Sequence, residues 1–200
     1  LSIGIFGKIY SIFLKRKSFF SGINGLLTSV FLLDFGFSLA GIFIPLYIFK
    51  ITHSFVWVFA FYLLFDLTII VFTLPAARLV ARFGSDKISF TGTISRSLFF
   101  LFLILSGKNI LFLVPAAVLW GLAIPLYWLP FHLSVVGSDQ ALAVGKDSAK
   151  INLVSKLATI AGPVLGGVII QTLGFTSLYL FGFVFLIASG LSLFFDKYEF

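Results

Sequence analysis

The 200-residue sequence contains no cysteine and no methionine, and only 10% of its residues are charged. The absence of cysteine excludes disulfides, thiolate metal sites and a cysteine nucleophile. The low charge excludes a soluble globular domain, because such domains average about a quarter charged residues. Since the chain begins at Leu1 and has no methionine, we expect it to be part of a longer one.

Residues suited to catalysis are scarce as well. The chain has two histidines and a single glutamate, Glu199. It therefore has no HExxH motif, no cluster of metal ligands and no nucleophile–base pair, so an intramembrane enzyme has little support. A glycine-rich phosphate loop is also missing, which argues against an ATP-driven pump in this chain. We expect no cofactor and no metal ion.

Apolar residues, by contrast, make up 60% of the chain, and 28 of them are phenylalanine. A helix needs about 20 apolar residues to cross a bilayer core of about 30 Å. Several runs reach this length, and none alternates apolar with polar residues as barrel strands do. The sequence therefore predicts an all-α integral membrane protein. Its six transmembrane helices are expected at residues 20–49, 55–77, 88–106, 110–136, 151–173 and 176–195.

The basic residues are divided unequally between the two ends of these runs. Only Lys50 and Lys108 fall on one side, and Arg96 lies inside a run. The other eleven fall on the opposite side: Lys8, Lys15, Arg16, Lys17, Arg78, Arg82, Lys87, Lys146, Lys150, Lys156 and Lys197. Since cytoplasmic loops carry the excess of Lys and Arg, we expect both termini in the cytoplasm. The segment 1–19 would then be a cytoplasmic N-terminal segment of a multi-pass protein of the cell (inner) membrane.

The same distribution argues against nucleic acid as a partner. The net charge of +7 is spread between apolar runs and does not form one basic patch.

Three charged residues lie inside the predicted helices. Asp34 is 17 residues after Lys17 and 16 before Lys50, so it lies about 25 Å from each flank. Asp66 is also central in its run, and Arg96 lies slightly toward the cytoplasm. Each costs about 2.5–3.5 kcal/mol or more at the bilayer centre unless it is paired or hydrated.

These charges have a structural and a functional interpretation. They are either ion pairs that lock helices together or a proton or substrate site in a polar cavity, and intramembrane charges favour the second. The predicted helices contain two acids and one base, so one carboxylate is left without a partner and is able to carry a proton. We expect Asp34 and Asp66 to couple protons or bind cations. Arg96 is expected to pair with one acid or to bind an anionic group of a substrate.

Aromatic residues at the middle of the fourth predicted helix are the other candidates. Trp120, Tyr127 and Trp128 lie away from the helix ends, where an interfacial aromatic belt would be expected. They either line a central cavity or simply pack against neighbouring helices.

Two stretches resemble motifs of the major facilitator superfamily of secondary transporters. The first, from Ala77 to Lys87, resembles the signature loop G-x-L-a-D-r-x-G-r-k between helices two and three. Leu79, Arg82 and Gly84 match it, whereas Ala81 stands where the family has an aspartate. In the family that aspartate belongs to a charged latch on the cytoplasmic face, so a latch of this form is not expected here.

The second stretch, from Ala158 to Gly167, resembles the family's G-x-x-x-G-P-x-x-G-G motif in helix five, which is typical of its antiporters. Gly162, Pro163, Gly166 and Gly167 match it. Gly162 and Gly166 are also spaced for close helix packing. The resemblance implies an N-terminal six-helix bundle made of two inverted three-helix repeats. It also implies a partner, either a C-terminal six-helix half or a second copy.

The resemblance implies transport of a small solute by alternating access. The helix-five motif favours a proton-coupled antiporter that exports lipophilic or cationic compounds, although a sugar, peptide or organic anion would also fit. Arg82 and Gly84 would shape a cytoplasmic hinge, and the glycines of helix five would form a flexing contact. The alternative is a non-transporting membrane scaffold or receptor that keeps the transporter fold.

Overall fold

The computed structural model describes residues 23–136 and 141–195, which are almost entirely helical. The predicted N-terminal segment 1–19 lies outside the described residues. The elements are α2 (Ile23–Gly41), α3 (Ile44–Thr52), α4 (Phe55–Phe83), α5 (Ser85–Ser106), a 3₁₀ turn η1 (Ile110–Phe112), α6 (Leu113–Val136) and α7 (Ala141–Phe195).

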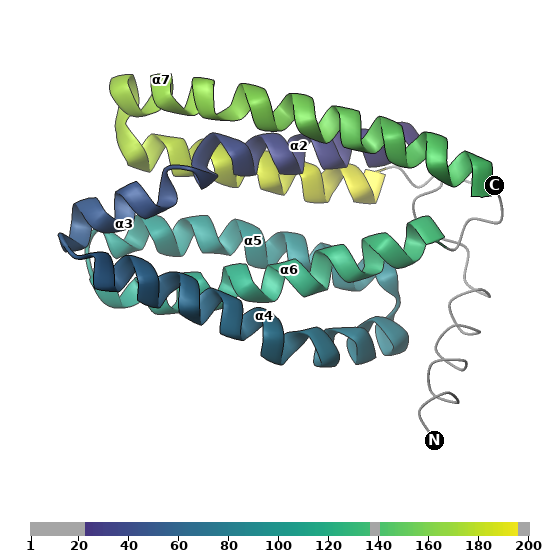
Figure 1. Cartoon of the computed structure of the whole chain (residues 1–200), viewed down its shortest axis with the longest axis horizontal. Coiled ribbons are helices and arrows are strands. Elements are labelled where there is room, and N and C mark those ends of the chain that lie inside the picture. Colours follow the sequence, from purple (N-terminus) through teal and green to yellow (C-terminus); the bar gives the residue numbers. More distant parts are fainter. Residues whose placement is uncertain (1–22, 137–140, 196–200) are drawn as a thin grey trace.

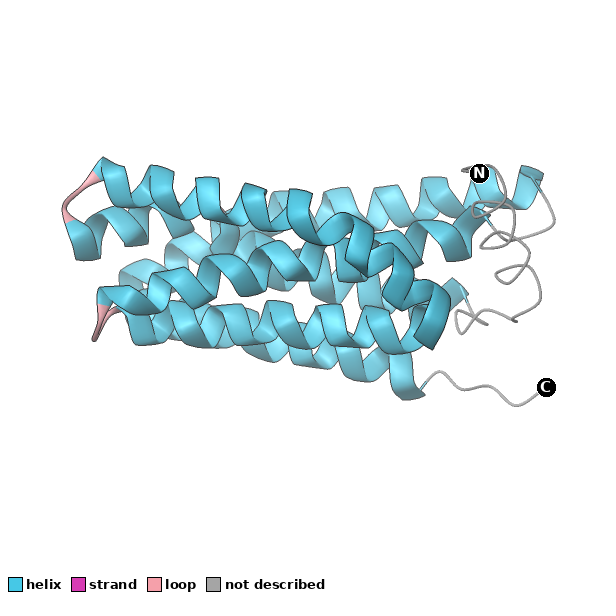
Figure 2. Ribbon diagram, turned by 90° about the horizontal axis from the view of Figure 1, so that it is seen from below, coloured by secondary structure: helices cyan, strands magenta, loops and turns pink. Residues whose placement is uncertain are grey.

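The helices run roughly parallel or antiparallel to one another and form an elongated bundle (Figures 1 and 2). Element α7 is two helical arms joined at Gly174, and they lie on either side of α2 (Figure 1). Contacts link α4 to α6, α6 to α5, α5 to α7 and α7 to α2. The second arm carries the contact with α5, because Gly182 packs against Phe100 and Gly190 against Thr93. The helices therefore follow one another in a row that begins with α4 and ends with the first arm of α7.

Glycines let neighbouring helices approach closely at several points of this row. A Cβ atom at Gly121 of α6 would lie 2.6 Å from the Thr68 Cβ of α4. One at Gly92 of α5 would lie 2.8 Å from the backbone nitrogen of Tyr127. Helices in a bilayer gain no hydrophobic drive from packing together, so this close contact is a main source of their association.

Aromatic rings fill the space between α4, α5 and α6. The Trp120 ring stacks on Phe99 with ring centroids 5.2 Å apart and lies 4.1 Å from the centroid of Phe65. Phe61 and Tyr62 pack against the same indole. Offset and edge-to-face pairs of this kind add about 0.5–1.5 kcal/mol each beyond burial. This cluster joins α4 firmly to the rest of the bundle along one stripe.

Five stretches are long and apolar enough to cross a membrane among the described residues, rather than the six that we predicted. The difference lies in α7, where the fifth and sixth predicted helices belong to one 55-residue element. Gly174 interrupts it with φ 82° and ψ 176°, a conformation that is essentially restricted to glycine. Gly84, between α4 and α5, has nearly the same backbone angles, φ 91° and ψ 158°.

Helix ends also differ from the predicted segments. The segment predicted over 20–49 contains a break, because α2 ends at Gly41 and α3 begins at Ile44. Pro45, in the first turn of α3, has no N–H and its ring would clash with the carbonyl of Gly41 in a continuous helix. Element α7 begins at Ala141, before the predicted start at residue 151. Hydropathy marks where a chain leaves the bilayer, whereas a helix is free to continue beyond it.

The geometry at Gly174 leads to a direct test. A Cβ atom there would have no neighbour within 4 Å, so Gly174→Ala adds backbone strain without a steric clash. We expect a loss of about 1–3 kcal/mol in stability, measured as a lower unfolding temperature in detergent. Gly167→Ala is the matched control, because Gly167 is helical and its Cβ would have ordinary contacts. Equal unfolding temperatures for both variants would contradict the turn at Gly174.

Candidate functional site

Asp34 lies near the middle of α2 and is half-buried. Its carboxyl lies beside the hydroxyl of Ser155 on the first arm of α7, and within electrostatic reach of Arg96 and Lys156. No hydrogen bond joins Asp34 to Arg96 in the part of the chain that the structure describes. The carboxylate thus interacts with two cations across space and is not held in a hydrogen-bonded ion pair.

Arg96 lies on α5 and is only 6% exposed. Its guanidinium carbon lies 4.6 Å from the centroid of the Phe37 ring, so the cation rests over an aromatic face of α2. Its Nε and Nη1 atoms have no hydrogen-bond partner within the described ranges. A buried guanidinium normally has its donors satisfied, so unpartnered donors here are an unusual feature.

Tyr127 and Trp128 of α6 lie next to these charges. Tyr127 is fully buried, and its hydroxyl lies near Ser29 and within electrostatic reach of Arg96 and Asp34. Trp128 is half-buried, contacts the Tyr127 ring edge-on, and stacks on His132 one turn further along α6. The structure therefore brings together Asp34, Arg96, Tyr127 and Trp128, and we call these residues with Ser155 and Lys156 the polar cluster.

Two of the predicted site residues lie elsewhere. Trp120 is buried in the aromatic core between α4, α5 and α6. Asp66 is exposed on α4. The buried residues of α4, which are Phe61, Thr68, Ala76 and Val80, form a separate stripe toward the bundle. Asp66 therefore does not join the polar cluster.

The residues that match the signature loop lie at the junction of α4 and α5. Leu79 and Arg82 are exposed in the last turns of α4, and the Arg82 guanidinium lies 5.2 Å from the Phe83 ring centroid. Gly84 connects the two helices with a positive φ of 91°, and its N–H donates to the carbonyl of Val80. This junction is a sharp turn that a residue with a side chain would strain.

The helix-five motif lies where the first arm of α7 crosses α2. A Cβ atom at Gly162 would clash with the side chain of Ser38, and one at Gly166 would clash with the carbonyl oxygen of Leu39. The Ser38 hydroxyl donates to the carbonyl of Ala158 at 3.0 Å. Pro163, which is half-buried, falls between the two glycines in the same stretch. This crossing lies one helical turn from Asp34, so the motif and the polar cluster share α2.

Sequence reasoning missed three members of this environment. The charge bias groups Lys156 with the cytoplasmic charges, whereas the structure places it on the first arm of α7, about four turns after the start of the helix and within electrostatic reach of Asp34. Phe37, three residues after Asp34, shares its helix face, and that spacing was the available signal. Ser155 carried no signal, because its contact with Asp34 depends on how α7 packs against α2.

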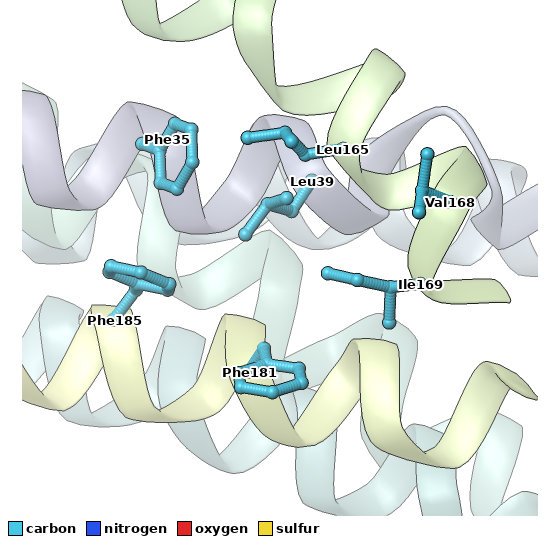
Figure 3. A pocket seen from close by; sticks show the side chains of 7 residues that line it. All are labelled: Phe35, Leu39, Leu165, Val168, Ile169, Phe181 and Phe185. Atoms are coloured by element: carbon cyan, nitrogen blue, oxygen red, sulfur yellow. The ribbon is translucent and has the colours of Figure 1, made fainter. Parts of the chain in front are cut away.

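An apolar pocket of about 320 Å³ lies between α2 and the two arms of α7 (Figure 3). Its lining residues are Phe35, Leu39, Leu165, Val168, Ile169, Phe181 and Phe185. None of them offers a polar group to orient a ligand, so we place the candidate site at the polar cluster. No group of three or more potential metal-ligating side chains is found in residues 23–136 and 141–195.

Comparison with known protein families gives a match over most of the chain. The sequence model described as Major Facilitator Superfamily matches residues 26–199. No curated protein and no solved structure matches the chain.

The crossing of α2 and α7 provides a second test with adjacent positions. Gly166→Ala would place a methyl group against the Leu39 carbonyl, so we expect it to destabilise the protein by about 1–3 kcal/mol. At Gly167 the nearest atom to a Cβ is the Phe43 Cζ at 3.8 Å. Gly167→Ala should therefore be neutral or stabilise by up to about 1 kcal/mol. The measurement is thermal unfolding in detergent, and a destabilised Gly167→Ala with an unaffected Gly166→Ala would contradict the packing.

Proposed function

Because this chain belongs to the major facilitator superfamily, a family of secondary transporters and not of enzymes, we propose that it carries a small solute by alternating access coupled to protons. The chain is a multi-pass membrane protein, and its substrate is a small molecule. The observation that supports proton coupling is the position of Asp34, half-buried among Arg96, Lys156 and Ser155.

Asp34 is suited to this role because its charge depends on neighbours from another helix. A carboxylate in the hydrocarbon core keeps its charge only while cations or hydrogen-bond donors support it. Ser155 and Lys156 belong to the first arm of α7, which crosses α2 at the Gly162 and Gly166 contact. If that arm shifts along α2, Asp34 loses part of its support and takes up a proton. Proton binding and helix movement are then two parts of one step.

The membrane topology is part of the proposal. We propose that the two arms of α7 cross the bilayer separately, so that the chain makes six crossings as two inverted three-helix repeats. The turns at Gly84 and Gly174 support this arrangement, because they join corresponding helices with nearly the same backbone angles. The excess of basic residues at Arg78, Arg82 and Lys87 favours a cytoplasmic position for the α4–α5 turn, and both termini on that side of the cell membrane.

A second helical body would complete the pathway. The two ends of the helix row, α4 and the first arm of α7, have the fewest buried positions along their length. Lipid is an adequate neighbour for their apolar residues, but not for Asp66, which is exposed near the middle of α4. We propose that a C-terminal six-helix half or a second copy of the chain faces α4, with water between them that hydrates Asp66.

Two alternatives concern the charge of the substrate and whether the protein transports at all. The glycine motif of α7 favours an exporter of lipophilic or cationic compounds, whereas the unpartnered donors of Arg96 favour an anion. A scaffold or receptor that keeps the fold without transporting would tolerate the loss of Asp34.

Replacing Asp34 tests proton coupling. We expect Asp34→Asn to abolish substrate-driven proton movement in proteoliposomes, because asparagine cannot carry the proton, while the protein still folds. The measurement uses a pH-sensitive dye, with benzoate and ethidium as anionic and cationic probes. Asp147→Asn is the matched control, because Asp147 lies outside the apolar runs. Undiminished proton movement in Asp34→Asn would reject coupling at this residue, and no movement in the unmodified protein would favour the scaffold.

Cysteine labelling tests whether water and a second helical body border the exposed face of α4. The sequence has no cysteine of its own that would interfere. Leu63→Cys would lie on the same exposed side of α4 as Asp66, and Leu98→Cys on an exposed position of α5. Thiols react as thiolates, which require water. We expect a charged thiosulfonate reagent to label Leu63→Cys much faster than Leu98→Cys in membranes. Equally slow labelling of both would mean that the α4 face borders lipid.

A further inference from the structure

Among the residues that the structure describes, Arg96 is the one buried charge whose surroundings point to a missing partner. It is 6% exposed, and its Nε and Nη1 atoms find no acceptor among the described residues. A guanidinium cannot lose its charge in a protein, so it cannot escape the cost of burial by becoming neutral. An acceptor that is not part of the described chain would satisfy these donors.

The charges around Arg96 favour a negative group. Asp34 from α2 is the only acid among the groups that affect Arg96 electrostatically within the described residues, and Tyr127 of α6 is the other such group. Lys156 from α7 also acts on Asp34. One carboxylate therefore faces two cations, so the cluster has an excess of positive charge.

The aromatic side chains around Arg96 would suit an anion with an apolar body. Phe37 covers one face of the guanidinium, and Tyr127 and Trp128 supply further aromatic surface. Arg96 is buried, whereas the side chains of Phe37, Trp128 and Asp34 are only half-buried. The polar cluster is therefore more open around these three side chains than around Arg96. A guanidinium donates charge-assisted hydrogen bonds to a carboxylate, and the Nε or Nη1 atom of Arg96 has a donor available for one.

We propose that Arg96 binds the carboxylate of the transported substrate, which is a small organic anion with an aromatic or apolar body. The proposal rests on the proposed transport function and names the substrate class of the same site. It separates this chain from exporters of cations, since a cationic ligand would meet Arg96 and Lys156.

A link to the proton follows from the position of Asp34. The carboxylate of Asp34 and that of the substrate compete for the field of Arg96. When Asp34 takes up a proton, the positive charge of Arg96 is left for the substrate. One proton and one monoanion then bind together without changing the net charge of the site, which corresponds to movement of both in the same direction.

The test uses three probes of nearly the same shape and different charge: benzoate, benzamide and benzamidine. Binding to the full chain in lipid nanodiscs is measured by the rise in unfolding temperature and by calorimetry. We expect benzoate to bind, and neither benzamide nor benzamidine to do so. Arg96→Gln should weaken benzoate binding about 10- to 100-fold, as expected for loss of hydrogen bonds to a charged group. Arg96→Lys keeps the charge without the guanidinium donors and should give an intermediate affinity.

Two further variants complete the experiment. Arg78→Gln is the matched control, since Arg78 is exposed near the end of α4 and should leave benzoate binding unchanged. In weakly buffered solution the unmodified protein should take up a proton when benzoate binds. Asp34→Asn should bind benzoate at least as well and take up none, which a merely structural role of Arg96 and Asp34 would not produce.

The outcomes separate this inference from the proposed function. Binding of benzamidine but not benzoate, benzoate binding that Arg96→Gln leaves unchanged, or binding of none of the three probes would overturn the carboxylate site. Benzoate binding that depends on Arg96, without any transport in proteoliposomes, would uphold the site and reject the transporter. Proton-coupled transport of ethidium but not benzoate would uphold the transporter and reject the site.

Discussion

A charged side chain in the hydrocarbon core loses its hydration, and the cost of that loss organises this bundle. Arg96 is buried where α5 meets α2 and α6, and the described groups that act on its charge, Asp34 and Tyr127, belong to other helices. Asp34, Phe37 and Tyr127 compensate that charge in part. Because the compensating groups belong to separate helices, any movement between those helices changes the electrostatic balance at Arg96.

The close packing of α2 with α7 connects this balance to the backbone. Gly162 and Gly166 bring α7 against Ser38 and Leu39 without space for a side chain. Ser155 and Lys156, which act on Asp34, lie about two to three turns earlier on the same arm. A contact made of backbone and small residues allows sliding better than interlocked large side chains would. The glycine contact and the residues that act on Asp34 are thus parts of one helix pair.

Element α4 differs from the pair of α2 and α7, because its two faces have different neighbours. Its inward stripe is fixed by the aromatic cluster around Trp120. Its other face is exposed and includes Asp66. The inward stripe of α4 is thus packed among aromatic rings, whereas its outward face carries a carboxylate. Trp120 is central in its helix, but it packs among the aromatic rings of α4 and α5 and does not belong to the polar cluster.

Hydropathy and charge bias in the sequence were enough to predict a helical membrane bundle and to find the charged residues within it. Each of those signals is local, since a run of apolar residues or a lone Asp34 can be recognised without its neighbours in space. The family motifs also predicted the class of protein, a secondary transporter. Tertiary structure alone decided that Asp34 joins Arg96 while Asp66 does not, and that Ser155 and Lys156 belong with them. These residues are separated by tens of positions and meet only through helix packing, which depends on glycine contacts whose partners the sequence does not reveal.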